Sequence, residues 1–341
     1  MIFVDGLPYP APGSQSRGQG RELLASLLDH PALISASNRL KATPERKVSV
    51  SDQSPPVKHV YVFQREYATV DPAAVELVGM DEATTCVGLV IRNRNNGMTS
   101  ISHMDFPKVV DKGLIQMLSL VADHEAILDV HLIGAFNDAS NEHDNDIPGS
   151  EGLREQDGYS MCLCSKIIDA LHNSHENFHL QTLCVLEHNT KRDSNGNACP
   201  IISGIVVNTL SGSIMPASFA RSSRCPDEIV RRIRVTVSSE DSSWKGRLLK
   251  TYDTFDDKFH IAPCYWLSDW GQIAFSLQQL SDSEILLRCS TSPSAESPDF
   301  VENERSIWSY LIQYPDWRQT FVGGKPRVFK RTSNGGWQRC E

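Results

Sequence analysis

The chain has 341 residues, of which 40% are hydrophobic and 22% are charged, so it is long enough for one large domain or two smaller ones and too apolar for global disorder. Its formal net charge of −9 argues against nucleic acid or an anionic membrane as a partner, because both bind basic patches. No apolar run reaches the roughly 18 residues of a membrane span, and residues 1–20 lack the basic start and apolar run of a secretory leader.

Helical and strand patterns alternate along the chain. Apolar residues at helical spacing predict helices at 21–28, 113–124, 159–172, 227–234 and 300–313. Alternating or continuous apolar runs predict strands at 2–4, 57–64, 75–79, 128–136, 180–189, 201–212, 214–219 and 259–265, with two more strands inside 82–103. Residues 42–57 and 137–152 are predicted to be polar loops, and Asn334-Gly335 predicts the turn of a final hairpin.

No strong linker interrupts this pattern, so we predict an α+β fold with a mixed or antiparallel sheet core. Residues 57–341 form the domain, and residues 1–56 are an extension that packs on or flanks it. A C-terminal half that folds separately from about residue 221 is the open alternative. Three arginines in the helix predicted at 227–234 form a short basic face that we expect to be solvated; they are Arg231, Arg232 and Arg234.

The nine cysteines are scattered without the spacing of a disulfide framework, and no Asn-x-Ser/Thr acceptor site is present. We therefore expect free thiols and a reducing compartment, the cytoplasm or also the nucleus. His172, His175 and His179 lie close in sequence, but no carboxylate–histidine framework joins them, so we expect no metal site.

Two predicted strands inside 82–103 carry Cys86 near the start and His103 at the end. If residues 93–96 form a four-residue turn, Arg92 pairs with Gly97, and the same register puts Cys86 directly opposite His103. Directly opposed residues have Cβ atoms about 4.5–5.5 Å apart, which permits contact between a thiol and an imidazole.

Other turn lengths leave this contact open. A two-residue turn at 96–97 pairs Cys86 with Pro107, and an odd turn length sends Cys86 and His103 to opposite faces. If the contact forms, the imidazole shifts the thiol, whose ordinary pKa is about 8.5, toward the nucleophilic thiolate and can protonate departing ammonia. Gly88, on the same face, would leave room for a substrate. The alternative is that Cys86 only packs in the core, where small buried cysteines are common.

The motif around the cysteine reads DEATTC at residues 81–86, with a histidine 17 positions after the cysteine. This motif resembles that of the protein N-terminal asparagine amidohydrolases. The resemblance covers most of the chain from about residue 57 to the end and includes LDVHLIGAFND (128–138), LQTLCVLEHN (180–189), GIVVN (204–208) and STSPSAESPDFVE (290–302). The tract SASNRLKATPERK (35–47) is similar to that of plant members.

The resemblance implies hydrolysis of the side-chain amide of an N-terminal Asn, in a protein or peptide with a free N-terminus, to give Asp and ammonia. It implies that Cys86 attacks the amide carbon to form a thioester, that His103 acts as acid and base, and that no metal or organic cofactor is needed. The new N-terminal Asp would feed the Arg/N-degron pathway of protein degradation. A protein glutamine deamidase and a non-catalytic module that binds N-termini are the alternatives, and we expect a monomer.

The same Cys-to-His spacing resembles that of the bacterial chemoreceptor glutamine deamidases, which implies a layered α-β-β sandwich. Those proteins carry a threonine upstream of the cysteine at the position that Met80 occupies here, so this role does not transfer. Thr84 and Thr85 are the substitutes that the sequence offers for a third catalytic group.

Selection of a free N-terminus needs a carboxylate near the α-ammonium, because a lone buried cation is costly. The candidate carboxylates lie in the motifs that carry the resemblance, with the one just before the nucleophile ranked first; they are Asp81, Glu82, Asp105 and Glu296. The candidate hydrogen-bonding residues are Thr85, Ser290, Thr291 and Ser292. The alternative for the serines is that they cap or turn the chain before the following helix.

Overall fold

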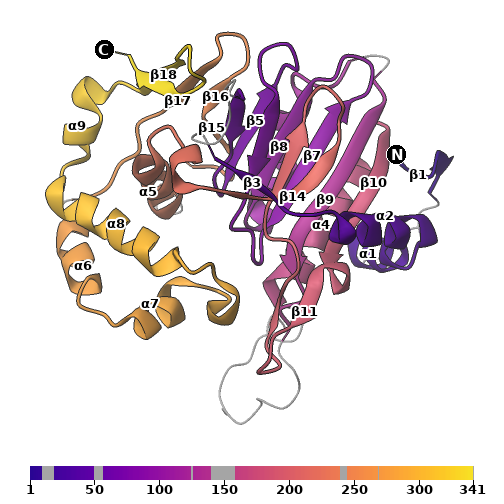
Figure 1. Ribbon diagram of the computed structural model, residues 1–341, viewed down its shortest axis with the longest axis horizontal. Coiled ribbons are helices and arrows are strands. Elements are labelled where there is room, and N and C mark those ends of the chain that lie inside the picture. The colour runs from indigo at the N-terminus through magenta and orange to yellow at the C-terminus, as the bar shows by residue number, and fades with distance from the viewer. Residues whose placement is uncertain are drawn as a thin grey trace.

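The computed structural model describes residues 1–9, 19–49, 57–123, 126–139, 158–238, 244–267 and 269–340. They form a mixed α/β fold with several sheets, and the two largest lie next to each other at the centre of the molecule (Figure 1). No helix of the described part is long and apolar enough to cross a membrane.

The larger sheet has eight strands in the order β15-β5-β8-β7-β9-β10-β1-β2. In that order the strands are Leu249–Lys250, Glu66–Val70, Thr99–Met104, Val87–Asn93, Leu128–Phe136, Phe178–Leu186, Ile2–Val4 and Leu7–Pro8. The sheet is mixed, because the pairs β15/β5, β9/β10 and β1/β10 are parallel and the other pairs are antiparallel. Since β1 pairs with β10, the N-terminal segment belongs to the same sheet as β7, the strand that follows the cysteine motif.

Helices cover one face of this sheet. They are α1 (Gln19–Leu28), α3 (Val110–Leu118) and α4 (Gly158–Asn173), and the short helix η1 (Pro107–Val109) precedes α3. Leu23, Leu24 and Leu27 recur at helical spacing on α1, and they share a buried cluster with Leu89 and Ile91 of β7. Helix α2 (Pro31–Ala42) follows α1 and packs against β10.

The second sheet covers the other face, in the order β3-β14-β13-β6-β4. Its strands are Arg46–Val48, Ile214–Phe219, Ile205–Asn208, Leu77–Met80 and His59–Tyr61. Val90, Ile101 and Ile133 of the large sheet share a buried cluster with Met80 and Ile205 of the second sheet. Helices, large sheet and second sheet therefore form successive layers, and side chains that alternate along β7 divide between the two interfaces.

The C-terminal part lies beside the sheets, on the side away from α1 and α2 (Figure 1). Its helices are α5 (Glu228–Ser238), α6 (Trp270–Leu277), α7 (Asp282–Cys289), α8 (Phe300–Gln313) and α9 (Trp317–Thr320). A four-stranded sheet joins them, with strands β16 (Tyr252–Asp253), β17 (Lys258–Ile261), β18 (Arg327–Arg331) and β19 (Trp337–Arg339). Val230, Ile307 and Trp308 belong to the same buried cluster as Val60 and Val90, so this part shares the core between the two sheets.

The remaining elements are short. Strands β11 (Thr190–Arg192) and β12 (Ala198–Pro200) form a hairpin, and the other 3-10 helices are Glu187–Asn189, Arg221–Ser223, Pro293–Ala295 and Val322–Gly324. The predicted helix at 300–313 and the predicted strand at 128–136 are confirmed with their bounds. Helices α2, α6 and α7 were not predicted, and β3 lies in the predicted loop 42–57. Residues 140–152 of the predicted loop 137–152 lie outside the described residues.

The prediction of a solvated basic face on α5 is wrong. Arg231 is 0% exposed and Arg234 is 4% exposed. Arg231 donates hydrogen bonds to both carboxylate oxygens of Glu66, at 3.2 and 2.6 Å, and to the backbone carbonyl of Tyr61. A buried acid at the start of β5, 165 residues earlier in the chain, therefore accounts for the burial of this cation.

Candidate active site

The register between β7 and β8 differs from the predicted one. Gly88 pairs with His103 and Arg92 pairs with Thr99, so the prediction that Cys86 lies directly opposite His103 is wrong. The reason is Asn93, which is buried and continues the strand instead of starting the turn. Its side chain donates to the backbone carbonyl of Val121 at 2.9 Å and accepts from the backbone N–H of Asn95.

The observed register differs from the predicted one by two residues, an even number, so each side chain still lies on the predicted face of the sheet. Cys86 directly precedes β7, and extension of the register makes it the diagonal neighbour of His103 on the same face of the sheet. Diagonal neighbours have Cα atoms about 7–8 Å apart, with Cβ atoms somewhat closer. The two side chains therefore point into the same interface without the direct opposition that the four-residue turn predicted.

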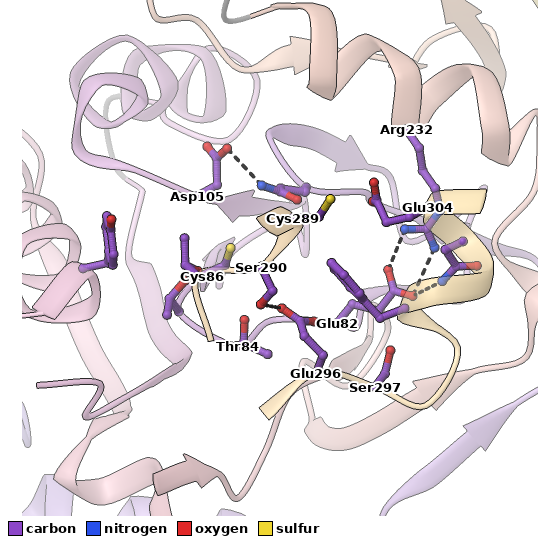
Figure 2. Close-up of a pocket in the computed structure, with 16 residues that line it drawn as sticks. Glu82, Thr84, Cys86, Asp105, Arg232, Cys289, Ser290, Glu296, Ser297 and Glu304 are labelled. Atoms are coloured by element: carbon purple, nitrogen blue, oxygen red, sulfur yellow. Dashed lines mark hydrogen bonds and ion pairs between the residues drawn. The ribbon is translucent and has the colours of Figure 1, made fainter. Parts of the chain in front are cut away.

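Cys86 opens into a cavity of about 210 Å³ between the end of the sandwich and the C-terminal helices (Figure 2). Its lining residues come from the cysteine motif, from the turn after β8 and from the stretch between the end of α7 and the first turns of α8; they include Thr84, Thr85, Cys86, Asp105, Cys289, Ser290, Thr291, Glu296 and Glu304. His103 lines an adjoining hollow of about 80 Å³. The two hollows share the four residues Gln64, Glu82, Arg232 and Glu304.

Burial sets the protonation of both reactive groups. Burial raises the pKa of the Cys86 thiol well above its ordinary value, and the negative charges of Asp105 and Glu296 add to the effect. Burial lowers the pKa of His103 to about 4. The predicted shift of Cys86 toward thiolate is therefore not found in this state. At neutral pH the pair consists of a thiol and a neutral imidazole, whose two nitrogens have no hydrogen-bond partner among the described residues.

Asp81 lies outside the cavity lining, and its carboxylate serves the fold. It is buried and accepts hydrogen bonds from the Tyr61 hydroxyl at 2.6 Å and from the Phe219 backbone N–H at 2.8 Å. Arg224 forms an ion pair with it at 3.1 Å. Asp81 thus ties the strand before the motif to β14.

Glu82 lines both hollows, but two arginines already neutralise its carboxylate. Arg224 and Arg232 approach its oxygens to 2.7 and 3.0 Å, and the Asn303 amide donates to it at 3.3 Å. Its backbone φ of 62° lies in the left-handed region, which a residue with a Cβ rarely adopts. This strained turn directs the chain from β6 toward Cys86.

Asp105 is also paired. The guanidinium of Arg65 contacts its Oδ2 through Nε at 2.9 Å and Nη2 at 2.6 Å, and the Gln64 amide donates to the same oxygen. Arg65 is held in turn by the Ser238 hydroxyl at 2.7 Å and lies over the Trp244 ring. Asp105 therefore lines the cavity with a carboxylate that is already paired with Arg65 in a buried ion pair.

Glu296 has a different environment. It lines the cavity, and its carboxylate accepts a short hydrogen bond from the Ser290 hydroxyl. Within the ranges that the structure describes, no cation forms an ion pair with it. Burial raises its pKa, and the Ser290 hydrogen bond opposes this effect. Glu296 is thus a partly buried carboxylate that lacks a countercharge among the described residues.

The predicted hydroxyl residues divide into two groups. Thr85 and Thr291 line the cavity, and their hydroxyls lie 3.2 Å apart, which joins the cysteine motif to the C-terminal segment. Ser290 lines the cavity beside Glu296. Ser292 is buried outside the cavity lining, and its backbone N–H donates to Ser290 Oγ, which stabilises the turn before α8.

The sequence predictions missed Glu304, Arg232 and Cys289 as lining residues. The helical spacing of α8 could have identified Glu304, because Phe300, Asn303 and Glu304 lie on one face of this helix and all line the cavity. The residues Glu82, Arg232 and Glu304 lie together at the junction of the two hollows.

Comparisons with known proteins match this chain across its length. The family model described as protein N-terminal asparagine amidohydrolase matches residues 49–339. A protein of that name from Arabidopsis thaliana is 51% identical over 353 aligned residues, and the alignment covers 100% of both chains. Proteins of the same name from Mus musculus and Homo sapiens are 32% and 31% identical, and each alignment covers 91% of both chains.

Proposed function

This chain belongs to the protein N-terminal asparagine amidohydrolase family, and on that premise we propose that it hydrolyses the side-chain amide of N-terminal Asn in proteins and peptides. The observation that carries the proposal is the cavity at Cys86. It holds a buried thiol, it adjoins the hollow of a neutral imidazole on the same sheet face, and it contains a carboxylate that has no countercharge within the described part of the chain.

In the proposed mechanism Cys86 Sγ attacks the side-chain amide carbon, and the thiol proton passes to His103. His103 can accept this proton because its imidazole is neutral at neutral pH, although a pKa of about 4 makes it a weaker base than a free imidazole. The same proton then goes to the amide nitrogen, the carbon–nitrogen bond breaks, and ammonia leaves a thioester on Cys86. His103 next takes a proton from water, the resulting hydroxide attacks the thioester, and Asp and the thiol are released.

We assign the substrate α-ammonium to Glu296. Only the Cβ and the Cα separate the α-nitrogen of Asn from its carboxamide carbon, so the carboxylate that binds it must lie near the nucleophile. Glu296 meets this condition, because its charge acts on the Cys86 thiol. Asp81 and Glu82 are neutralised by arginines and Asp105 by Arg65, whereas Glu296 lacks a cation among the described residues. A cationic ligand would therefore gain most at Glu296.

Smaller groups complete the proposed site. Thr85 and Thr291 offer hydroxyls to the carboxamide, and Ser290 orients Glu296.

The order of layers, helices on a sheet on a second sheet, supports the proposed kinship with chemoreceptor glutamine deamidases. We further propose that the protein acts as a monomer in the cytoplasm and that its product enters the Arg/N-degron pathway.

Mass spectrometry and ammonia detection test the proposal on four peptides that differ only at the start: Asn, Gln, N-acetyl-Asn and Asp. We expect a gain of one mass unit and one equivalent of ammonia from the free Asn peptide alone. The Gln peptide carries one more methylene, and we expect its kcat/KM to be lower by about 10–200-fold or more. Tight binding of the Asn peptide without a mass change would support the non-catalytic module instead.

A further inference from the structure

Glu304 is a second carboxylate of the cavity that forms no hydrogen bond or ion pair with the described residues. It lies on α8 and lines both the hollow of Cys86 and the hollow of His103. Burial raises its pKa to about 7, and the negative charges of Glu296 and Glu82 oppose its ionisation further.

The nearby cation, Arg232, compensates the negative charge of Glu304 only in part, because its charge lowers the pKa of Glu304 less than burial raises it. Arg232 is the arginine that shares the cavity with Glu304, but it forms ion pairs with Glu82 and Glu228, each at 3.0 Å. Two carboxylates therefore already share this guanidinium. When the α-ammonium of a substrate is bound, the two carboxylates of Glu296 and Glu304 have only this one ligand cation between them.

The positions of Glu296 and Glu304 relative to Cys86 decide which carboxylate binds the α-ammonium and which binds a second cation. Figure 2 shows Glu296 and Ser290 beside Cys86, and Glu304 farther away, next to Arg232. The carboxylates whose charges raise the pKa of Cys86 are Asp105 and Glu296. An α-ammonium must remain close to the sulfur that attacks its own side chain, so Glu304 faces the part of the substrate beyond the first residue.

We infer that Glu304 forms a subsite for a cationic side chain, Lys or Arg, at the second residue of the substrate. The inference rests on the proposed function, because the Asn side chain at Cys86 fixes the direction of the peptide. A lysine or arginine would displace water from both hollows and pair with a carboxylate that burial has left uncompensated. Substrate choice would then depend on two residues, the N-terminal Asn and the one that follows it.

The test compares peptides that begin Asn-Lys, Asn-Gln and Asn-Glu, with the wild-type protein, Glu304→Gln and a matched control, Glu302→Gln. Glu302 lies on the same helix, and its side chain is 71% exposed. We expect the wild type and Glu302→Gln to prefer Asn-Lys over Asn-Gln by roughly tenfold in kcat/KM, mainly through KM. In Glu304→Gln we expect the ratio of the kcat/KM values for Asn-Lys and Asn-Gln to fall to about one, through a higher KM for Asn-Lys.

A binding measurement separates this inference from the proposed function. The dissociation constants of the same peptides are measured with Cys86→Ala, with and without Glu304→Gln. Tighter binding of Asn-Lys that requires Glu304 supports the subsite even if the wild type deamidates no peptide. Equal binding of Asn-Lys and Asn-Gln overturns it, and so does a loss of kcat on Asn-Gln in Glu304→Gln, which would place Glu304 at the reacting groups.

Discussion

Gly88 lies directly across the β7–β8 ladder from His103, and the second sheet packs against it there. A Cβ added at Gly88 would lie 3.0 Å from Met80 Sδ and 3.3 Å from both the Ile133 carbonyl oxygen and Ile205 Cδ1. The space beside this glycine is therefore filled by the second sheet and is not open to the substrate, contrary to the expectation from the sequence. The glycine permits the close approach of the sheets that holds His103 in place.

Replacement of Gly88 by Ala should destabilise the protein by about 1–3 kcal/mol, because the carbonyl of Ile133 cannot move without disturbing the large sheet. Urea unfolding followed by circular dichroism measures this difference. Gly336→Ala is the control, since a Cβ at Gly336 would meet only the ends of two side chains, Thr332 Oγ1 and Asn334 Oδ1, which can move aside. A Gly88→Ala protein as stable as the wild type would contradict the packing argument.

Cys86→Ala and Cys86→Ser should each lower kcat on a free Asn peptide by on the order of 10³-fold or more, because the proposed thioester cannot form. Thermal unfolding should change little for Ala, since Cys86 is small and lies beside the cavity. Cys289→Ser is the control, because this thiol lines the same cavity but has no role in the mechanism. Retained turnover in Cys86→Ala would refute the nucleophile.

Glu296→Gln should raise KM for the free Asn peptide by roughly 10–100-fold, since the α-ammonium loses its countercharge. The N-acetylated peptide serves as the internal control, because it lacks the positive charge and should react equally poorly with both proteins. Steady-state ammonia release on the two peptides gives the comparison. An unchanged KM in Glu296→Gln would assign the α-ammonium to another group.

Arg65→Met should cost about 3–5 kcal/mol, because it leaves the buried carboxylate of Asp105 without its cation. The double variant Arg65→Met/Asp105→Asn should recover part of this loss, since no uncompensated charge remains. Guanidinium unfolding of the wild type, both single variants and the double variant gives the coupling energy. Additive single effects would show that the ion pair is not responsible.

Glu304 should make stability depend on pH. Its pKa in the folded protein is about 7, above the ordinary value of 4.5, so the folded state holds this proton more tightly than the unfolded chain. The stability of the wild type relative to Glu304→Gln should fall as the pH rises from about 4.5 to about 7 and remain lower above that range. The expected difference is on the order of 1–3 kcal/mol, measured by urea unfolding at pH 5 and pH 8. The charged groups that act on Glu304 are Arg232, Glu296 and Glu82.

Sequence patterns predicted the elements whose apolar spacing is strong. Helix α8 and strand β9 appear with the predicted bounds, since their apolar residues pack on the core at the expected period. Helix α2 escaped prediction because its serines and asparagine give a weak apolar face. Tertiary contacts support it, including a hydrogen bond from Ser37 Oγ to the Leu183 carbonyl, 146 residues away.

The site was predictable only in part for a similar reason. An even number of turn residues is enough to place Cys86 and His103 on the same face of the sheet. The register, however, depends on the burial of Asn93, whose side chain donates to the Val121 carbonyl in a later segment. The sequence also could not rank the carboxylates. Asp81 ranked first because it lies just before the proposed nucleophile, yet Arg224, 143 positions later, neutralises it.

The contact between Thr85 and Thr291 spans 206 positions of the chain. The Cys86 side of the cavity and the wall that holds Ser290, Thr291 and Glu296 therefore come from distant parts of the chain. A truncation before residue 290 removes that wall, so we expect the fragment to lose activity on a free Asn peptide even where its sheets assemble.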